Sequence, residues 1–203
     1  MHFAAAVIGN AEWNPELHHA GHHHYLAMRL TLEKLAAAGC RRPMAIIEGG
    51  VNERARRAWE AAFLVYHPTP ASAPALLLLG RPASTQEISR RVRAARPDAI
   101  IVSEEGLLNA LASRRTKPPG LRIVTLHWTS NRPELGGVDQ SYDLIAANAV
   151  DLVVSQLNSN ETGVPALPRM LLFPGRWVEP GAKHETRPAP PVVSPGGAAG
   201  SRR

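Results

Sequence analysis

Short apolar runs alternate along this chain with longer segments in which apolar residues recur at helical spacing. Each of these runs predicts a buried strand, and they lie at residues 3–8, 44–47, 75–79, 99–103 and 122–126. Glycine, proline or a capping side chain separates most of the runs from the helical segments around them. Strands that alternate with helices in this way are typical of an α/β protein with a mostly parallel sheet flanked by helices.

The segments between the predicted strands carry the helical pattern. In the first of them, Met28, Leu32 and Leu35 recur at i, i+4 and i+7, and Gly39 ends the helix. The second helix is predicted to run from about Asn52, as its N-cap, to Tyr66. Further helices are predicted at about residues 84–96, 107–111 and 141–158.

Three further segments do not belong to the alternating strands and helices described above. A proline- and histidine-rich connection follows the first strand and reaches to about residue 24. Residues 131–140 form a second connection, which leads into the long helix. Residues 168–173 are a final extended segment that runs into Arg176, Trp177 and Val178.

Composition places the chain among globular proteins, because 44% of its 203 residues are hydrophobic and 20% are charged. No apolar run is long enough to span a membrane, and the first residues lack the pattern of a signal peptide. We therefore expect a cytoplasmic protein without a membrane partner. Cys40 is the single cysteine, which excludes an intrachain disulfide and a thiolate zinc site.

The net charge of +6 is unevenly distributed. Residues 182–203 carry half of the excess, with Lys183, Arg187, Arg202 and Arg203 against Glu185. The same segment is rich in proline and glycine and has too little apolar surface to offset the entropy of ordering. A disordered basic tail is therefore predicted at residues 182–203, and the charge of the remaining chain is a weak indication of a polyanionic partner.

Three segments of the sequence, taken together in their order and spacing, form a pattern that points to one family of proteins. Residues 38–46 read Ala-Gly-Cys-Arg-Arg-Pro-Met-Ala-Ile, where a helix ends and a strand begins. Residues 133–140 read Pro-Glu-Leu-Gly-Gly-Val-Asp-Gln, ahead of the helix that contains Ala-Ala-Asn-Ala-Val-Asp-Leu at residues 146–152. Residues 171–178 read Leu-Leu-Phe-Pro-Gly-Arg-Trp-Val. In order and spacing the set resembles LacI/GalR-type transcription regulators, over about residues 3–181.

The resemblance implies a periplasmic-binding-protein-like sensor of type I, with two α/β lobes joined by crossing strands and a small effector, often a sugar or nucleoside, in the cleft. It places a sensor domain at residues 1–181, with the second lobe at 25–128. Residues 3–9 and 138–160 are then what remains of an incomplete first lobe. The chain departs from the family pattern at Cys40, which replaces the usual histidine, and at Pro43, which replaces an apolar residue.

The family's helix-turn-helix, which binds operator DNA in a homodimer, has no counterpart in this sequence. We therefore expect an N-terminally truncated product or a shortened gene model that contains the effector-sensing and dimerisation portion of a regulator and has no catalytic activity or cofactor. The strand at residues 3–8 and the helix at 141–158 would then lack most of the sheet against which they pack. An exposed apolar patch is expected on both.

The resemblance also suggests the effector-binding residues. Trp59 occupies the position of a family arginine that contacts the effector, and it can stack on a sugar ring or simply pack against the lobe. Arg56 or Arg57 lies close enough in sequence to supply the missing guanidinium. His127 and Trp128 stand where the family has acidic effector contacts. Gln140 matches a family glutamine or merely caps the helix that follows, and His23 lies on a crossover that lines the cleft. The predicted effector-binding set is Trp59, Arg56, His127, Trp128, Gln140 and His23.

A histidine cluster supports an alternative function, a small α/β metal-dependent enzyme. Five imidazoles fall within seven positions, at His18, His19, His22, His23 and His24. Against a metal site, the segment is predicted to be a connection, and only Glu12 and Glu16 lie near enough in sequence to add carboxylate ligands. The chain also lacks a nucleophile elbow, a phosphate-binding loop and a dinucleotide fingerprint. A third alternative, an exported solute-binding protein, is disfavoured because no export signal is found.

Overall fold

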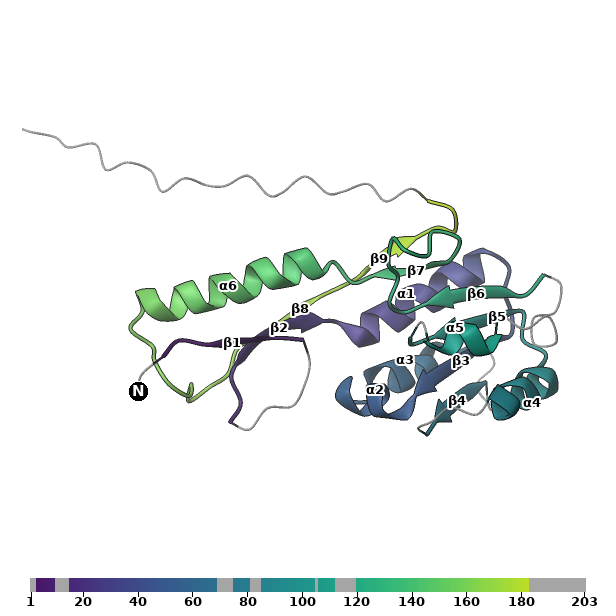
Figure 1. Cartoon of the computed structure of the whole chain (residues 1–203), viewed down its shortest axis with the longest axis horizontal. Coiled ribbons are helices and arrows are strands. Elements are labelled where there is room, and N and C mark those ends of the chain that lie inside the picture. Colours follow the sequence, from purple (N-terminus) through teal and green to yellow (C-terminus); the bar gives the residue numbers. More distant parts are fainter. Residues whose placement is uncertain are drawn as a thin grey trace, which may run out of the picture.

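Two sheets of unequal size organise the chain (Figure 1). The computed structural model describes residues 3–9, 15–68, 75–80, 85–104, 106–111 and 120–182, so the predicted basic tail lies outside the described residues except for Ala182. The smaller sheet consists of β1 (Ala6–Ile8), β2 (His18–His22) and β8 (Met170–Phe173), in that order and all parallel.

The larger sheet contains most of the predicted strands. Its order is β4 (Leu76–Leu79), β3 (Pro43–Glu48), β5 (Ala99–Val102), β6 (Arg122–Thr125), β7 (Gly136–Asp139) and β9 (Arg176–Val178). All neighbouring strands are parallel except β7 and β9, which are antiparallel. The predicted strands at residues 44–47, 99–103 and 122–126 are confirmed as β3, β5 and β6.

Helices cover both faces of the larger sheet. On one face lie α1 (His24–Ala37), α2 (Gly49–Arg54) and α3 (Ala58–Tyr66), and on the other lie α4 (Thr85–Ala95) and α5 (Gly106–Leu111). Ile47 packs among the α1 and α3 side chains, whereas its neighbour Ile46 packs against α4 and α5. Because successive side chains point to opposite faces and both faces are buried, these strands are continuously apolar in sequence.

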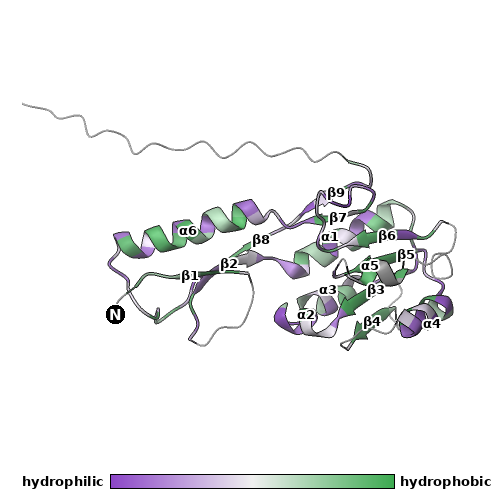
Figure 2. Ribbon diagram, in the orientation of Figure 1, coloured by the Kyte–Doolittle hydropathy of each residue, from purple (hydrophilic) through white to green (hydrophobic). Residues whose placement is uncertain are grey.

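The smaller sheet has one helix, α6 (Tyr142–Asn158), packed on one of its faces. Ile145, Ala149 and Leu152 of α6 contact Ala20 of β2 and the inward side chains of β8. The outer side of α6 and the other face of the sheet keep apolar side chains in contact with solvent, notably Val150, Val154, Leu157, Met170 and Leu172. Figure 2 shows apolar residues along both α6 and β8. The apolar exposure expected on the long helix is therefore found, and in the predicted strand at residues 3–8 the side chains of Phe3 and Ile8 are also exposed.

The histidine-rich segment differs from the prediction, because residues 18–22 form a strand rather than a connection. β2 lies between β1 and β8 and pairs with both. Its side chains at His18 and Ala20 are fully buried. The sequence gives no apolar run here because imidazoles take positions that aliphatic residues usually fill in a central strand.

The helix predicted at residues 52–66 is interrupted and forms α2 and α3. Arg56 and Arg57 adopt the left-handed conformation, with φ of 50° and 55°. Asn52 is buried within α2 and donates from Nδ2 to Glu60 Oε2 at 2.8 Å, so it is not an N-cap. Two successive left-handed residues cannot continue an α-helix, and the apolar periodicity on either side does not reveal this.

The connection predicted at residues 131–140 contains β7. A Cβ atom at Gly137 would lie 2.2 Å from the carbonyl oxygen of Thr125 in β6, so the close approach of these strands requires glycine. β7 pairs with β6 and β9 in the larger sheet, and residues 138–139 therefore do not belong with the smaller one. None of the described helices is both long and apolar enough to cross a lipid bilayer.

Candidate functional site

The chain passes between the two sheets at three crossings that lie together (Figure 1). β2 leads into α1, β7 into α6, and β8 into β9. The first and third crossings are joined by a hydrogen bond in which the His23 amide donates to the Phe173 carbonyl at 2.9 Å. At the third crossing a Cβ on Gly175 would lie 2.1 Å from Val138 Cγ1. The crossings are therefore tightly packed at the point where the two sheets meet. Each sheet with the helices that pack on it is called a lobe from here on, the larger lobe around the six-stranded sheet and the smaller lobe around the three-stranded sheet.

Five aromatic and imidazole rings surround these crossings, and we call them the junction cluster: His22, His24, Trp59, His127 and Tyr142. The His22 ring lies edge-on to Tyr142 at 4.7 Å between centroids and 5.8 Å from His24. The His24 ring lies 4.5 Å from Trp59, and His127 lies 5.4 Å from Tyr142. Side chains from both lobes thus contact one another directly.

Burial determines the charge of the junction cluster. It lowers the pKa of His22 to about 4, with a further contribution from the nearby His127. Burial likewise lowers the pKa of His24 to about 4, with His22 as the next cause. Burial also raises the pKa of Tyr142. At neutral pH, His22, His24 and Tyr142 are therefore uncharged.

Two adjoining cavities lie between the lobes beside the first crossing. The smaller cavity has a volume of about 130 Å³, and its lining includes the histidines of β2 and α1, Ala55, Arg56 and Ala58 from the α2–α3 turn, and Met170 and Leu172 of β8. The larger cavity, of about 210 Å³, is lined by Glu16, Leu17 and Leu167 among others. His19, Arg56 and Met170 line both. Because each lobe contributes to the walls, a ligand here would contact both lobes at once.

Two of the predicted effector-binding residues lie on these cavities. Arg56 lines both cavities and is exposed. His23 lines the smaller cavity, and its Nδ1 atom accepts a hydrogen bond from the Leu26 amide at 3.4 Å, which caps α1. These positions are compatible with a ligand contact, and effector binding by Arg56 and His23 stays a prediction.

The other four predicted residues take other positions. Trp59 is 3% exposed and packs in the core beside α1, where it reaches the smaller cavity only through His24. His127 belongs to the junction cluster through Tyr142. Trp128 donates from Nε1 to the Leu135 carbonyl at 2.9 Å, and Gln140 donates from Nε2 to the Leu126 carbonyl at 2.7 Å. Both of these side chains are buried, and the described lining of the two cavities does not include them.

Sequence reasoning missed several residues of this region. His19, Tyr25, Met170 and Leu172 line the smaller cavity, and Tyr142 connects His22 with His127. For Tyr142 a signal existed, because it begins the helix directly after the recognised segment that ends in Gln140. The others come together only through the pairing of β2 with β8 and the packing of α1 on α3.

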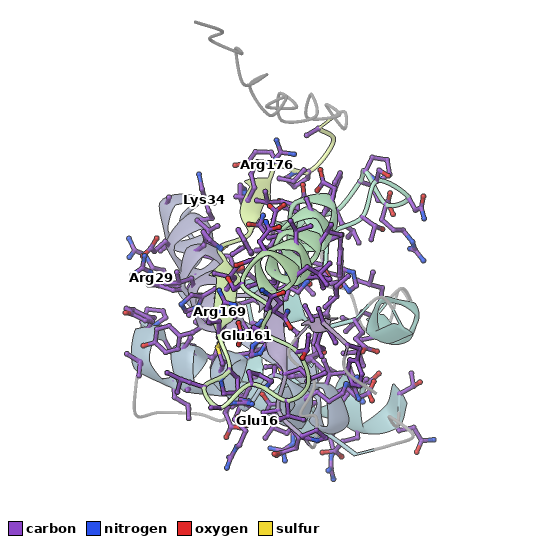
Figure 3. All side chains as sticks on the ribbon, turned by 90° about the vertical axis from the view of Figure 1, so that its left-hand side faces the viewer. Glu16, Arg29, Lys34, Glu161, Arg169 and Arg176 are labelled. Atoms are coloured by element: carbon purple, nitrogen blue, oxygen red, sulfur yellow. The ribbon has the colours of Figure 1, made fainter. Side chains whose placement is uncertain are left out.

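The structure does not support a metal site in the histidine segment. The Nδ1 atom of His18 accepts from the Arg169 amide at 2.8 Å, and its Nε2 atom lies 3.0 Å from Glu161 Oε1. Arg169 and Glu161 also pair with each other at 2.9 Å and lie side by side in Figure 3. Within the described part of the chain, no three His, Cys, Asp or Glu side chains are placed to hold a metal ion.

Known structures with the same fold are numerous. A periplasmic binding protein/LacI transcriptional regulator from Alkaliphilus metalliredigens QYMF, complexed with D-xylulofuranose, is 15% identical with a TM-score of 0.64, over 90% of this chain and 71% of that chain. A LacI-type transcription regulator from Bifidobacterium animalis subsp. lactis is 19% identical with a TM-score of 0.62, over 89% and 72%. A LacI family transcriptional regulator from Enterococcus faecium, with bound ribose, is 13% identical with a TM-score of 0.61, over 90% and 71%.

Sequence comparisons add no closer relative. No model of a protein family matches the chain, and no curated protein matches it. The structural likenesses therefore show the fold: a mixed α/β architecture with a mostly parallel sheet flanked by helices, shared with LacI-type regulators and periplasmic binding proteins. At the level of fold, the resemblance seen in the sequence is confirmed.

Proposed function

We propose that this chain is the ligand-sensing part of a LacI-type transcription regulator and that a small organic molecule binds between its two lobes. The observation that carries this proposal is the pair of cavities whose walls come from both lobes beside the three crossings. Similarly folded regulators hold D-xylulofuranose or ribose, which supports a small-molecule ligand. In the complete regulator, operator DNA would be read by a helix-turn-helix outside this chain, in a homodimer.

The geometry suggests how ligand binding would become a signal. A molecule in the smaller cavity would contact Arg56 on one lobe and Met170 on the other. A ligand that bridges the lobes favours the arrangement in which they are closest. It shifts the equilibrium between the closed and open arrangements by the difference in its binding free energy to the two. The tightly packed crossings at His23 and Gly175 are the segments around which the lobes would rotate.

Blocking the smaller cavity tests this function. Ala58 lines the cavity at the start of α3, whereas Ala61 on the same helix is exposed, so Ala58→Trp and Ala61→Trp form a matched pair. A panel of small metabolites that includes D-ribose is titrated into each protein while the melting temperature is followed. We expect at least one compound to stabilise the wild type and Ala61→Trp but not Ala58→Trp. Stabilisation of all three proteins alike, or of none, contradicts the proposal.

A further inference from the structure

The charge pattern of the smaller cavity narrows the chemistry of its ligand. Among the described residues that line this cavity, Arg56 is the only arginine, and lysine, aspartate and glutamate do not occur. We propose that the ligand is a small organic carboxylate with an apolar body and that the Arg56 guanidinium binds its carboxylate group. This inference rests on the proposed sensing function and specifies the class of effector.

Arg56 is held in place by an unusual turn. Arg56 and Arg57 are consecutive residues in the left-handed conformation, which is costly for residues with a side chain and is found preferentially at functional sites. Arg57 is occupied, since its Nε and Nη2 atoms donate to Glu60 at 2.9 and 2.6 Å. The same Glu60 carboxylate accepts from the buried Asn52 side chain. This network fixes the turn from which Arg56 reaches the cavity.

Arg56 itself keeps its charge available. Its guanidinium forms no ion pair with any residue that the structure describes. Two imidazoles of the cavity lining add no second positive charge at neutral pH, because burial lowers the pKa of His22 and of His24 to about 4. Nearby Arg56 also lowers the pKa of His19, after burial as the larger cause. One guanidinium in a described lining without acidic side chains matches a ligand with one negative charge.

The aliphatic part of the wall is suited to an apolar body. Ala55, Ala58, Met170 and Leu172 contribute aliphatic surface to the cavity. Each hydroxyl of a sugar would need a hydrogen-bond partner when buried, and these four side chains offer none, so the polar side chains of the lining are confined to Arg56, Tyr25 and the histidines. The volume of about 130 Å³ is close to that of the apolar cavity of about 150 Å³ that admits benzene in an engineered protein. A monocyclic or short-chain carboxylate is therefore of suitable size.

The neighbouring larger cavity does not fit the same ligand. Its lining contains Glu16, whose carboxylate would repel an anion bound near the shared Arg56. In Figure 3, Glu16 lies at the bottom of the view, below the Glu161–Arg169 pair. The carboxylate group is thus assigned to the smaller cavity, whose described lining contains no acidic side chain.

Matched ligand pairs test this assignment directly. Benzoate is compared with benzyl alcohol, and hexanoate with hexanol, by isothermal titration calorimetry, with D-ribose as the neutral polyol. We expect a carboxylate to bind at least tenfold more tightly than its alcohol, because the alcohol cannot form a bidentate, charge-assisted contact with a guanidinium. Arg56→Gln is expected to reduce carboxylate binding at least tenfold, and Arg56→Lys, which keeps the charge, to reduce it less.

Arg93→Gln is the control variant, because Arg93 is exposed on α4 at the other face of the larger sheet. It should bind carboxylates like the wild type, and circular dichroism verifies that each variant is folded. Equal binding of acid and alcohol, full binding by folded Arg56→Gln, or binding of D-ribose alone overturns this inference and leaves the sensing function standing. Failure of every compound, D-ribose included, to bind the wild type overturns both.

Discussion

The imidazole of His24 lies edge-on against the indole of Trp59, with 4.5 Å between the ring centroids. This contact joins the first residue of α1, directly after the first crossing, to α3 of the larger lobe. Trp59 is 3% exposed and belongs to the core between α1 and the larger sheet. Through His24, the core of one lobe supports the wall of the cavity that both lobes share.

Replacing Trp59 should therefore weaken the fold before it affects any ligand. Trp59→Ala is expected to lower the free energy of unfolding by about 3–5 kcal/mol, the usual cost of removing a large buried aromatic side chain. Urea unfolding followed by far-ultraviolet circular dichroism measures this change. Leu64→Ala on the same helix is the control, because Leu64 is 59% exposed and its removal should cost little. Similar losses for the two variants would contradict a core role for Trp59.

The buried histidines predict how stability depends on pH. In the unfolded chain His22 and His24 titrate near 6.5, whereas in the fold burial lowers the pKa of each to about 4. Between these values the unfolded state binds more protons than the folded state, so stability falls as the pH is lowered from about 6.5 towards about 4. Each histidine contributes on the order of 3 kcal/mol over this window.

Urea unfolding midpoints measured from about pH 4.5 to about pH 8 check this dependence of stability on pH. The range spans the ordinary pKa of histidine, about 6.5. His24→Phe should flatten the dependence, because an aromatic ring remains at the site but no longer takes up a proton. His67→Gln replaces a histidine at the end of α3, outside the junction cluster, and serves as the control. An unchanged slope in His24→Phe would show that His24 is not a source of the effect.

The buried amide of Gln140 predicts a structural effect at the second crossing. Gln140 is 4% exposed and donates from Nε2 to the Leu126 carbonyl at 2.7 Å. Gln140→Met keeps the length of the side chain but leaves that carbonyl without its donor, at an expected cost of about 1–3 kcal/mol in unfolding free energy. Gln86→Met on the exposed side of α4 is the matched substitution and should be nearly neutral. Loss of ligand binding by Gln140→Met without any loss of stability would favour the effector contact predicted from the sequence.

The third crossing predicts a strict requirement for glycine. A Cβ atom on Gly175 would lie 2.1 Å from Val138 Cγ1 and 3.0 Å from the Asp139 carbonyl oxygen. Gly175→Ala is therefore expected to destabilise the protein by about 1–3 kcal/mol, the usual cost of overpacking. Gly106→Ala is the control, because a Cβ atom at that helical position would meet no described atom within 4 Å. Equal melting temperatures for the two variants would contradict this prediction, because they would show that the chain at Gly175 can move away from Val138 at little cost.

The part of the fold that could be predicted is the part in which local pattern and burial agree. β3 and β5 are buried on both faces, so nearly every residue along them is apolar and the strands stand out in the sequence. The long helix α6 was found for a similar reason, since Ile145, Ala149 and Leu152 repeat on one side. For the site, the sequence placed Arg56 and His23 among the candidates, and both line the smaller cavity.

The sequence alone determined the α/β class and the succession of most strands and helices, because these follow from local composition and spacing, and through the family resemblance it named Arg56 and His23 as candidates. Only the tertiary structure decided that the histidine segment is the central strand β2, that Gly136–Asp139 is β7, and that Arg56 and Met170 line the same cavity from different lobes. Each of these depends on pairing between segments far apart in the chain. Such contacts are fixed by the packing of the whole molecule and leave no periodic signal in the residues that make them.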